Sequence, residues 1–136
     1  MTDNQNIPEI ELFETENTDE FDKEVKRFVK KKKFVALPDM LEVLADEVRA
    51  GVFGDNVWFH DETPTPYDVY KKRLPNPDNN DGKSNGFRVI YAVMAEHKFV
   101  LFASVYYKKE VTEIKERYVR ALIEGFILND EQPLSN

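Results

Sequence analysis

Two long apolar runs, separated by a short polar turn, constrain the fold of this 136-residue chain more than any other feature. Phe87–Met94 and Phe99–Tyr107 are each long enough for a strand, and Ala95-Glu96-His97-Lys98 between them is short enough for a hairpin turn. Both alternating sets of the first run are largely apolar, which is typical of a strand covered on both faces. The sequence therefore predicts a central antiparallel hairpin.

Two helices are predicted before this hairpin. Asn17-Thr18-Asp19-Glu20 offers a capping side chain with a glutamate three residues later, and apolar residues follow at helical spacing from Phe21 to Val29. Leu37-Pro38-Asp39 starts a second helix with proline in its first turn, and Gly51 ends it. A helical hairpin is therefore expected in the N-terminal half.

The remaining elements flank this framework. Glu9 to Leu12 alternates acidic and apolar residues like a short strand, and Tyr67 to Leu74 reads as another strand. Pro75 to Gly86 is rich in proline, asparagine and glycine and is expected to be a loop. Thr112 is expected to cap a C-terminal helix with its apolar stripe between Ile114 and Phe126.

This order of elements predicts an α+β fold. We expect a small antiparallel sheet, mixed through its N-terminal strand, with the helical hairpin and the C-terminal helix on one side of it. With 136 residues, 41% of them hydrophobic, the chain is long enough for one core and too short for two ordinary domains. A single domain over residues 1–136 is expected, with its core at about 9–127 and polar tails at both ends.

Composition excludes several classes of function. Cysteine is absent, which excludes disulfides, thiolate metal sites and a cysteine nucleophile. The polar, acidic start does not resemble a signal peptide, and no apolar stretch approaches the roughly 20 residues needed to cross a bilayer. His60 and His97 belong to no close cluster, so no metal or other cofactor is expected. The chain is predicted to be cytoplasmic, with no membrane partner.

Charge is distributed unevenly along the chain, whose net charge is -7. Nine acidic residues and one lysine lie between Met1 and Glu24, whereas the predicted sheet region from Tyr67 to Lys109 has eight basic and four acidic residues. A cationic sheet in an acidic chain is a candidate binding surface for phosphate groups. We interpret the separate run Lys30 to Lys33 as a solvated helix end that complements the helix dipole.

Four segments together resemble the RelE/ParE toxin superfamily of type II toxin-antitoxin systems, over roughly Glu9 to Ile127. They are Lys71-x-Arg73-Leu74, Gly82-Lys83-Ser84-Asn85-Gly86, Phe87-Arg88-Val89-Ile90-Tyr91 and Tyr106-x-Lys108-x-Glu110. The resemblance implies a RelE-like fold and, in its RelE-like branch, a ribosome-dependent mRNA endoribonuclease that is neutralised by a cognate antitoxin. The partners would then be the antitoxin, the ribosome and mRNA. A ParE-like gyrase poison, and an inactive toxin fold kept as an interaction module, remain alternatives.

The resemblance also implies a set of catalytic residues, namely Lys71, Arg73, Arg88 and Lys108. The endoribonucleases of this family use the ribose 2′-hydroxyl as the nucleophile and no metal, so cations must stabilise the charge on the phosphate. Arginine suits that role, because its planar fork grips two phosphate oxygens and stays ionised. Crowding of Lys71 by Arg73 and Arg88 is one route to a neutral lysine that acts as a base.

The proton donor is left open by the sequence. A tyrosine of the family's ribonucleases is missing near the start of the last helix, where this chain has Glu113-Ile114-Lys115. The possible donors are the nearby tyrosines Tyr106, Tyr107 and Tyr118. Further contacts with RNA are expected from Lys72, Lys83 and Lys109. We interpret the two histidines as ordinary surface or packing residues.

Overall fold

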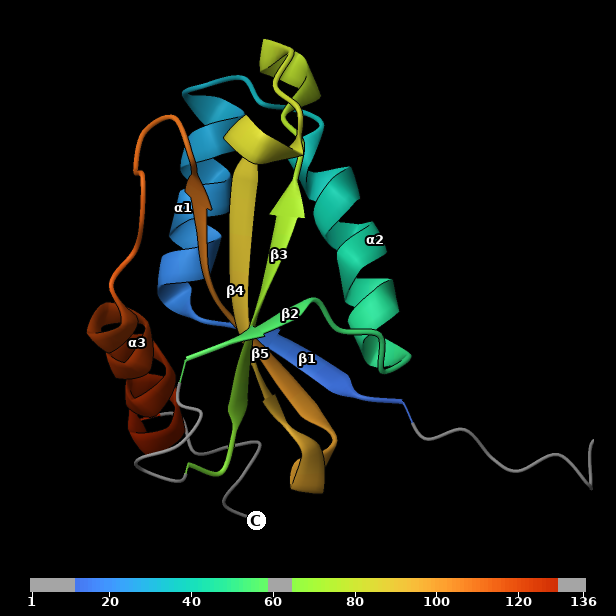
Figure 1. Cartoon of the computed structure of the whole chain (residues 1–136), viewed down its shortest axis with the longest axis vertical. Coiled ribbons are helices and arrows are strands. Elements are labelled where there is room, and N and C mark those ends of the chain that lie inside the picture. Colours follow the sequence, from blue (N-terminus) through green and yellow to red (C-terminus); the bar gives the residue numbers. More distant parts are fainter. Residues whose placement is uncertain (1–11, 59–64, 130–136) are drawn as a thin grey trace, which may run out of the picture.

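The structure, a computed structural model, describes residues 12–58 and 65–129. Within these ranges it has an α+β fold with a mixed five-stranded sheet in the order β1-β5-β4-β3-β2 (Figure 1). The strands are β1 (Glu14–Asn17), β2 (Asp55–Val57), β3 (Asp68–Leu74), β4 (Phe87–Met94) and β5 (Phe99–Tyr107). The helices are α1 (Asp19–Lys30), α2 (Leu37–Arg49) and α3 (Glu116–Asn129), and none of them is long and apolar enough to cross a membrane.

The hairpin of β4 and β5 forms the centre of the sheet, with the bounds that the sequence predicts. Every residue of both strands is buried. The register runs from Phe87 opposite Tyr107 to Met94 opposite Phe99, with a bulge on β5 at Ala103. A bulge adds one residue to one strand, so the alternation of side chains between the two faces shifts there. The residues of β5 after Ala103 therefore point to the opposite face from the one that simple alternation assigns them.

The helices α1 and α2 cover one face of the sheet. Thr18 caps α1 by accepting a hydrogen bond from the Phe21 backbone N–H at 3.1 Å, whereas Asn17 instead donates to Asp22 at 2.8 Å. Phe21 and Phe28 on α1 are buried in a core that also includes Leu44 of α2. The predicted helical hairpin is confirmed.

The helix α3 lies on the other face of the sheet, which corrects the expectation that all helices share one side. Val119 and Ile123 of α3 pack in a second core with Ile90 of β4 and Leu101 of β5, and Figure 1 shows α3 and α2 on opposite sides of the strands. The reason is physical: strands that are apolar on both faces need cover on both faces.

Three further predictions were wrong or incomplete. Thr112 does not cap α3, because the segment 108–115 is irregular and α3 begins at Glu116. The short strand β2 was not predicted. The expected strand from Glu9 to Leu12 lies outside the described residues except for Leu12, which is not in a strand. The first strand that the structure describes is β1, which pairs parallel with β5 at one edge of the sheet. The polar tails also lie outside the described residues.

Candidate functional site

The predicted catalytic residues of β3 and β4 lie on one face of the sheet. Alternation along β3 places Lys71 and Arg73 on the same face as Val69, which packs in the core under α3. Arg73 lies directly opposite Arg88 on β4, and Arg88 lies opposite Tyr106 on β5. Like charges directly opposite each other destabilise a sheet. Local conflicts of this kind are typical of functional sites.

A hollow of about 570 Å³ opens on this face, beside the start of α3. We call it the cationic hollow because lysines outnumber glutamates three to two in its lining. The lining residues are Trp58, Lys71, Tyr106, Lys108, Thr112, Glu113, Ile114, Lys115 and Glu116. Lys71 comes from β3, Tyr106 from β5, and Lys108 from the segment that follows β5. Within residues 12–58 and 65–129, neither lysine nor the neighbouring Arg73 forms an ion pair with a carboxylate. Lys71 and Arg73 are therefore available to an anionic ligand, whereas the Lys108 amine also donates a hydrogen bond to the backbone carbonyl of Thr112.

Arg88 has a different environment from the other three predicted catalytic residues. Its side chain is buried, and its guanidinium donates to the backbone carbonyls of Lys83 at 2.8 Å, Ser84 at 3.0 Å and Phe87 at 3.2 Å. Burial lowers the pKa of Arg88, and the nearby Arg73 lowers it further. Arg88 thus ties the loop before β4 to the sheet, so it holds the edge of the site as well as adding charge to it.

Of the three tyrosines considered as proton donors, Tyr106 alone lines the cationic hollow. Tyr107 points to the face of α1 and α2, where its hydroxyl donates to Asp81 and accepts from Asn79 at 2.8 Å. Tyr118 is 42% exposed, and its neighbours Val119 and Ile123 on α3 are the buried ones. The sequence pattern places Tyr118 on the apolar stripe between Ile114 and Phe126. That prediction is wrong for Tyr118, whereas Ile114 and Phe126 pack against the core under α3.

The three lysines expected to add RNA contacts lie away from the cationic hollow. Lys72 points to the opposite face of β3, with its Nζ 3.9 Å from Glu47 of α2. Lys109 forms a 2.7 Å ion pair with Asp81, whose carboxyl also accepts from Tyr107, and these two contacts lower the pKa of Asp81. Lys83 is exposed on the loop that Arg88 holds. Only Lys83 is placed to extend the cationic surface.

Six of the nine residues that line the cationic hollow were not predicted as site residues. They are Trp58, Thr112, Glu113, Ile114, Lys115 and Glu116. Trp58 follows β2, a strand that the sequence did not reveal, and its place beside Lys71 depends on the pairing of β2 with β3. Lys115 lies just before α3 and was noted only as part of the segment without the family's tyrosine. Their proximity to β3 follows from the path of the chain and has no signal in local sequence.

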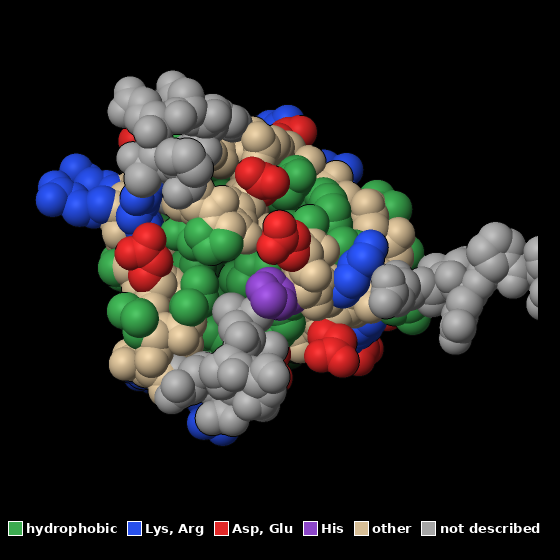
Figure 2. Space-filling view, turned by 90° about the horizontal axis from the view of Figure 1, so that it is seen from below, with side chains coloured by type: hydrophobic (Ala, Val, Ile, Leu, Met, Phe, Trp, Pro, Cys, Tyr) green, Lys and Arg blue, Asp and Glu red, His purple; other side chains and the backbone are tan. Residues whose placement is uncertain are grey.

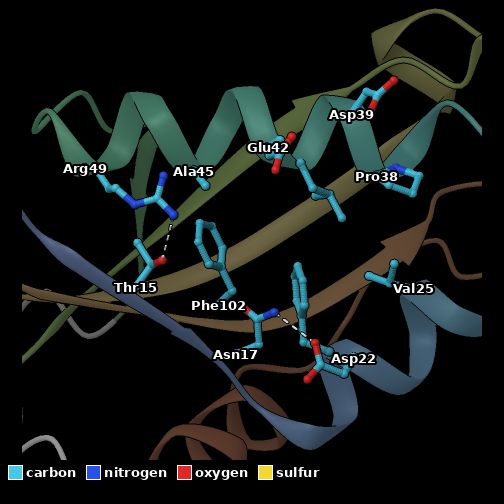
Figure 3. Close-up of a pocket in the computed structure, with 12 residues that line it drawn as sticks. Thr15, Asn17, Asp22, Val25, Pro38, Asp39, Glu42, Ala45, Arg49 and Phe102 are labelled. Atoms are coloured by element: carbon cyan, nitrogen blue, oxygen red, sulfur yellow. Dashed lines mark hydrogen bonds between the residues drawn. The ribbon is translucent and has the colours of Figure 1, made fainter.

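A second hollow, between α1 and α2, has the opposite charge character. It has a volume of about 360 Å³ and an apolar floor that includes Phe102, and Asp22, Asp39 and Glu42 lie at its rim (Figure 3). Its one basic residue, Arg49, is held by Asp46 at 2.9 Å. An acidic rim repels phosphate, so a phosphodiester ligand is expected at the cationic hollow rather than here.

The lower end of the molecule shows no comparable concentration of positive charge. It carries the turn between β4 and β5, and Figure 2 shows acidic, basic and hydrophobic side chains intermixed there. His97 lies exposed in this turn, and His60 lies outside the described residues. Within the described ranges, no three histidine, aspartate or glutamate side chains are grouped so that they can hold a metal ion.

No family model, curated protein or solved structure matches this chain. Its own residues and their geometry are therefore the evidence on which a function can be proposed. That geometry combines two lysines that form no ion pair within the described residues, a tryptophan and a tyrosine in one open hollow.

Proposed function

We propose that this chain is a RelE-like type II toxin, a metal-independent endoribonuclease that cleaves mRNA by attack of the ribose 2′-hydroxyl on the adjacent phosphate. The observation that carries the proposal is the cationic hollow, which is lined by Lys71 of β3, Lys108 of the segment after β5, and Tyr106 of β5. Neither lysine has a carboxylate partner within the described residues, so an RNA phosphate breaks no ion pair when it binds.

The chemistry of this cleavage needs positive charge around one phosphate. The phosphorane-like transition state carries more negative charge than the ground state, and preorganised cations stabilise that difference. Lys71 and Lys108 supply such cations in the lining of the hollow, and Arg73 and Arg88 lie on the same face of the sheet outside that lining. Removal of a single donor of this kind from an active site typically slows the reaction about 10²–10³-fold.

Aromatic side chains beside the cations favour RNA over a free phosphate ion. Trp58 lines the same hollow as Lys71 and Tyr106. Proteins that bind single-stranded RNA commonly stack its unpaired bases on aromatic rings, while basic residues follow the backbone. The substrate class that fits is therefore a single-stranded RNA, with one base beside Trp58 and the following phosphate beside the lysines.

The biological partners in this proposal follow from the resemblance to the RelE-like branch. They are mRNA held on the ribosome, which presents single-stranded substrate, and a cognate antitoxin that keeps the free toxin inactive. The competing outcomes are a gyrase poison and an inactive interaction module. Each predicts a different result in the same experiment.

Controlled expression in a bacterium, with mRNA integrity, ribosome association and DNA supercoiling followed together, tests this proposal. The variants are Lys71→Ala and the matched control Lys72→Ala, since Lys72 is adjacent on β3 but points to the other face beside Glu47. We expect rapid cleavage of ribosome-associated mRNA by the natural chain and by Lys72→Ala. We expect cleavage about 10²-fold slower, or more, from Lys71→Ala.

The other results would contradict the proposal in distinct ways. Intact mRNA together with damaged DNA would identify a gyrase poison. Growth without either effect would identify an inactive module. Cleavage that both lysine variants retain in full would remove the cationic hollow as the active site, even if the natural chain were a nuclease.

A further inference from the structure

The proposed cleavage needs a group that protonates the departing 5′-oxygen, and Tyr106 is placed to do so. All six tyrosines of the chain lie within the described residues. Tyr67 donates to Glu124 at 3.1 Å, and Tyr91 accepts a hydrogen bond from the Gly54 N–H at 2.7 Å. Tyr70 packs on the face of α1 and α2. With Tyr107 and Tyr118 also placed elsewhere, Tyr106 is the one tyrosine beside the lysines of the cationic hollow.

The Tyr106 side chain combines a fixed ring with an available hydroxyl. The residue is only 8% exposed and packs in the core under α3, so its ring is held by its neighbours. Among residues 12–58 and 65–129, the Tyr106 hydroxyl has no hydrogen-bond partner. It is also not one of the buried polar atoms in these residues that lack a partner, so the hydroxyl is exposed to the hollow that the residue lines. A rigid ring with an unengaged hydroxyl in a binding hollow is suited to contact a ligand.

The cross-strand neighbour of Tyr106 supports proton release. Burial raises the pKa of the Tyr106 hydroxyl, which keeps it protonated near neutral pH. The positive charge of Arg88 opposes that rise, and the negative charge of Glu113, which lines the same hollow, adds to it. Arg88 lies directly opposite on β4, fixed by its three backbone carbonyls. A fixed cation beside the phenol stabilises the phenolate that forms when the proton leaves.

We propose that Tyr106 is the proton donor of this site, a catalytic residue that protonates the leaving 5′-oxygen of the RNA. This inference rests on the proposed function. In the step, the bond from the 2′-oxygen to phosphorus forms and the bond from phosphorus to the 5′-oxygen breaks. The 2′-hydroxyl proton passes to a water molecule in the open hollow, and the Tyr106 proton passes to the 5′-oxygen, while the lysines stay protonated and stabilise the charge on the phosphate. The products are a 2′,3′-cyclic phosphate and a 5′-hydroxyl, and the proton released to water returns to the Tyr106 phenolate.

A substrate whose leaving group needs no proton tests this assignment. Ribosomes are programmed with an mRNA that carries a sulfur atom in place of the 5′-oxygen at the cleaved linkage, and single-turnover cleavage is compared with that of the natural linkage. On natural RNA, Tyr106→Phe should be slower than the natural chain by about 10²–10⁴-fold, which is the usual contribution of general acid catalysis. On the sulfur substrate, the two proteins should cleave within about tenfold of each other.

Three control variants separate the role of Tyr106 from other causes. Tyr70→Phe removes a hydroxyl from the opposite face of the sheet and should cleave both substrates like the natural chain. Lys71→Ala should be slow on both substrates, because a better leaving group does not replace a missing cation. His60→Ala tests a rival donor and should show no selective rescue by sulfur.

Each other result has a definite meaning. If the natural chain cleaves neither substrate, the proposed function fails. If the natural chain cleaves RNA and Tyr106→Phe cleaves it equally fast, the assignment of Tyr106 is wrong while the nuclease function stands. If Tyr106→Phe is equally slow on both substrates, its effect is structural, and selective rescue of His60→Ala would assign the role to that histidine instead.

Discussion

Arg27 on α1 and Glu110, just beyond the end of β5, form a bidentate ion pair with nitrogen–oxygen distances of 2.7 and 3.4 Å. Lys32 lies 3.4 Å from the same carboxylate. Glu110 belongs to the irregular segment 108–115, whose residues line the cationic hollow on the other face of the sheet. The ion pair therefore attaches the segment 108–115, which forms one wall of the cationic hollow, to α1. The helix α1 contributes no residue to that hollow.

This anchor predicts a pH-dependent loss of stability in Glu110→Gln. The hydrogen bond from Arg27 lowers the pKa of Glu110 below its ordinary 4.5, so its contribution is present above that value and is lost as the pH falls through the lower folded-state pKa. We expect Glu110→Gln to lower the free energy of unfolding by about 0.5–1 kcal/mol at pH 7 and by less at pH 3. Urea unfolding at both pH values measures the difference.

The matched control for this prediction is Asp46→Asn. Asp46 pairs with Arg49 within α2, and the Asp46 side chain is 77% exposed, so its loss should change the free energy of unfolding by less than about 0.5 kcal/mol. A difference between Glu110→Gln and the natural chain that stays constant from pH 7 to pH 3 would contradict the electrostatic origin of the effect.

The backbone contacts of Arg88 predict that lysine cannot replace it. A lysine at this position keeps the charge but cannot reach the carbonyls of Lys83 and Ser84 together, as the guanidinium does through two nitrogens. We expect Arg88→Lys to lower the free energy of unfolding by about 1–3 kcal/mol and to speed proteolysis within residues 75–86. Arg73→Lys, on the exposed partner directly opposite, should cost less than about 0.5 kcal/mol. Equal losses in the two variants would show that the carbonyl contacts contribute nothing.

Much of the fold was predictable because its signals are local. The hairpin of β4 and β5, the start of α1 near Thr18 and the proline-led start of α2 follow from patterns within one element. The side on which α3 packs was not predictable in this way. Two-sided apolar strands indicate that both faces are covered, but they do not say which helix covers which face, because that depends on the path of the segment 108–115.

The candidate site was predicted only in part, because one bulge decides which tyrosine reaches it. Without the extra residue at Ala103, alternation from Phe102 would place Tyr106 on the face of α1 and α2. With the bulge, Tyr106 lies on the face of Lys71 and Tyr107 does not. The contacts of Arg88 also could not be predicted, since they depend on where the preceding loop carries its carbonyl groups.

Thr18 connects the start of α1 to the bulge at Ala103 of β5 through two hydrogen bonds, and these contacts give a third prediction. Its hydroxyl accepts from the Phe21 N–H at 3.1 Å and donates to the carbonyl of Ala103 at 2.8 Å. Thr18→Ala removes both contacts and leaves a buried carbonyl without this donor, so we expect a loss of about 2 kcal/mol in the free energy of unfolding. Thr18→Ser keeps the hydroxyl and should recover most of it. Guanidinium unfolding followed by circular dichroism measures the free energy of unfolding of the natural chain, Thr18→Ser and Thr18→Ala, which should decrease in that order. Equal losses in both variants would refute the hydrogen-bond explanation.

The fourth prediction concerns how salt weakens RNA binding at the cationic hollow. Each phosphate contact that a cation makes with a single strand contributes about 0.7 to the slope of log affinity against log salt concentration. Lys71→Ala should therefore lower the magnitude of that slope by about 0.7, while Lys72→Ala, which alters the opposite face of β3, should leave it unchanged. Fluorescence anisotropy of a labelled single-stranded RNA between about 50 and 200 mM salt measures both slopes. If the two variants shift the slope equally, RNA is attracted by the overall charge of the strand, and the cationic hollow is not its binding site.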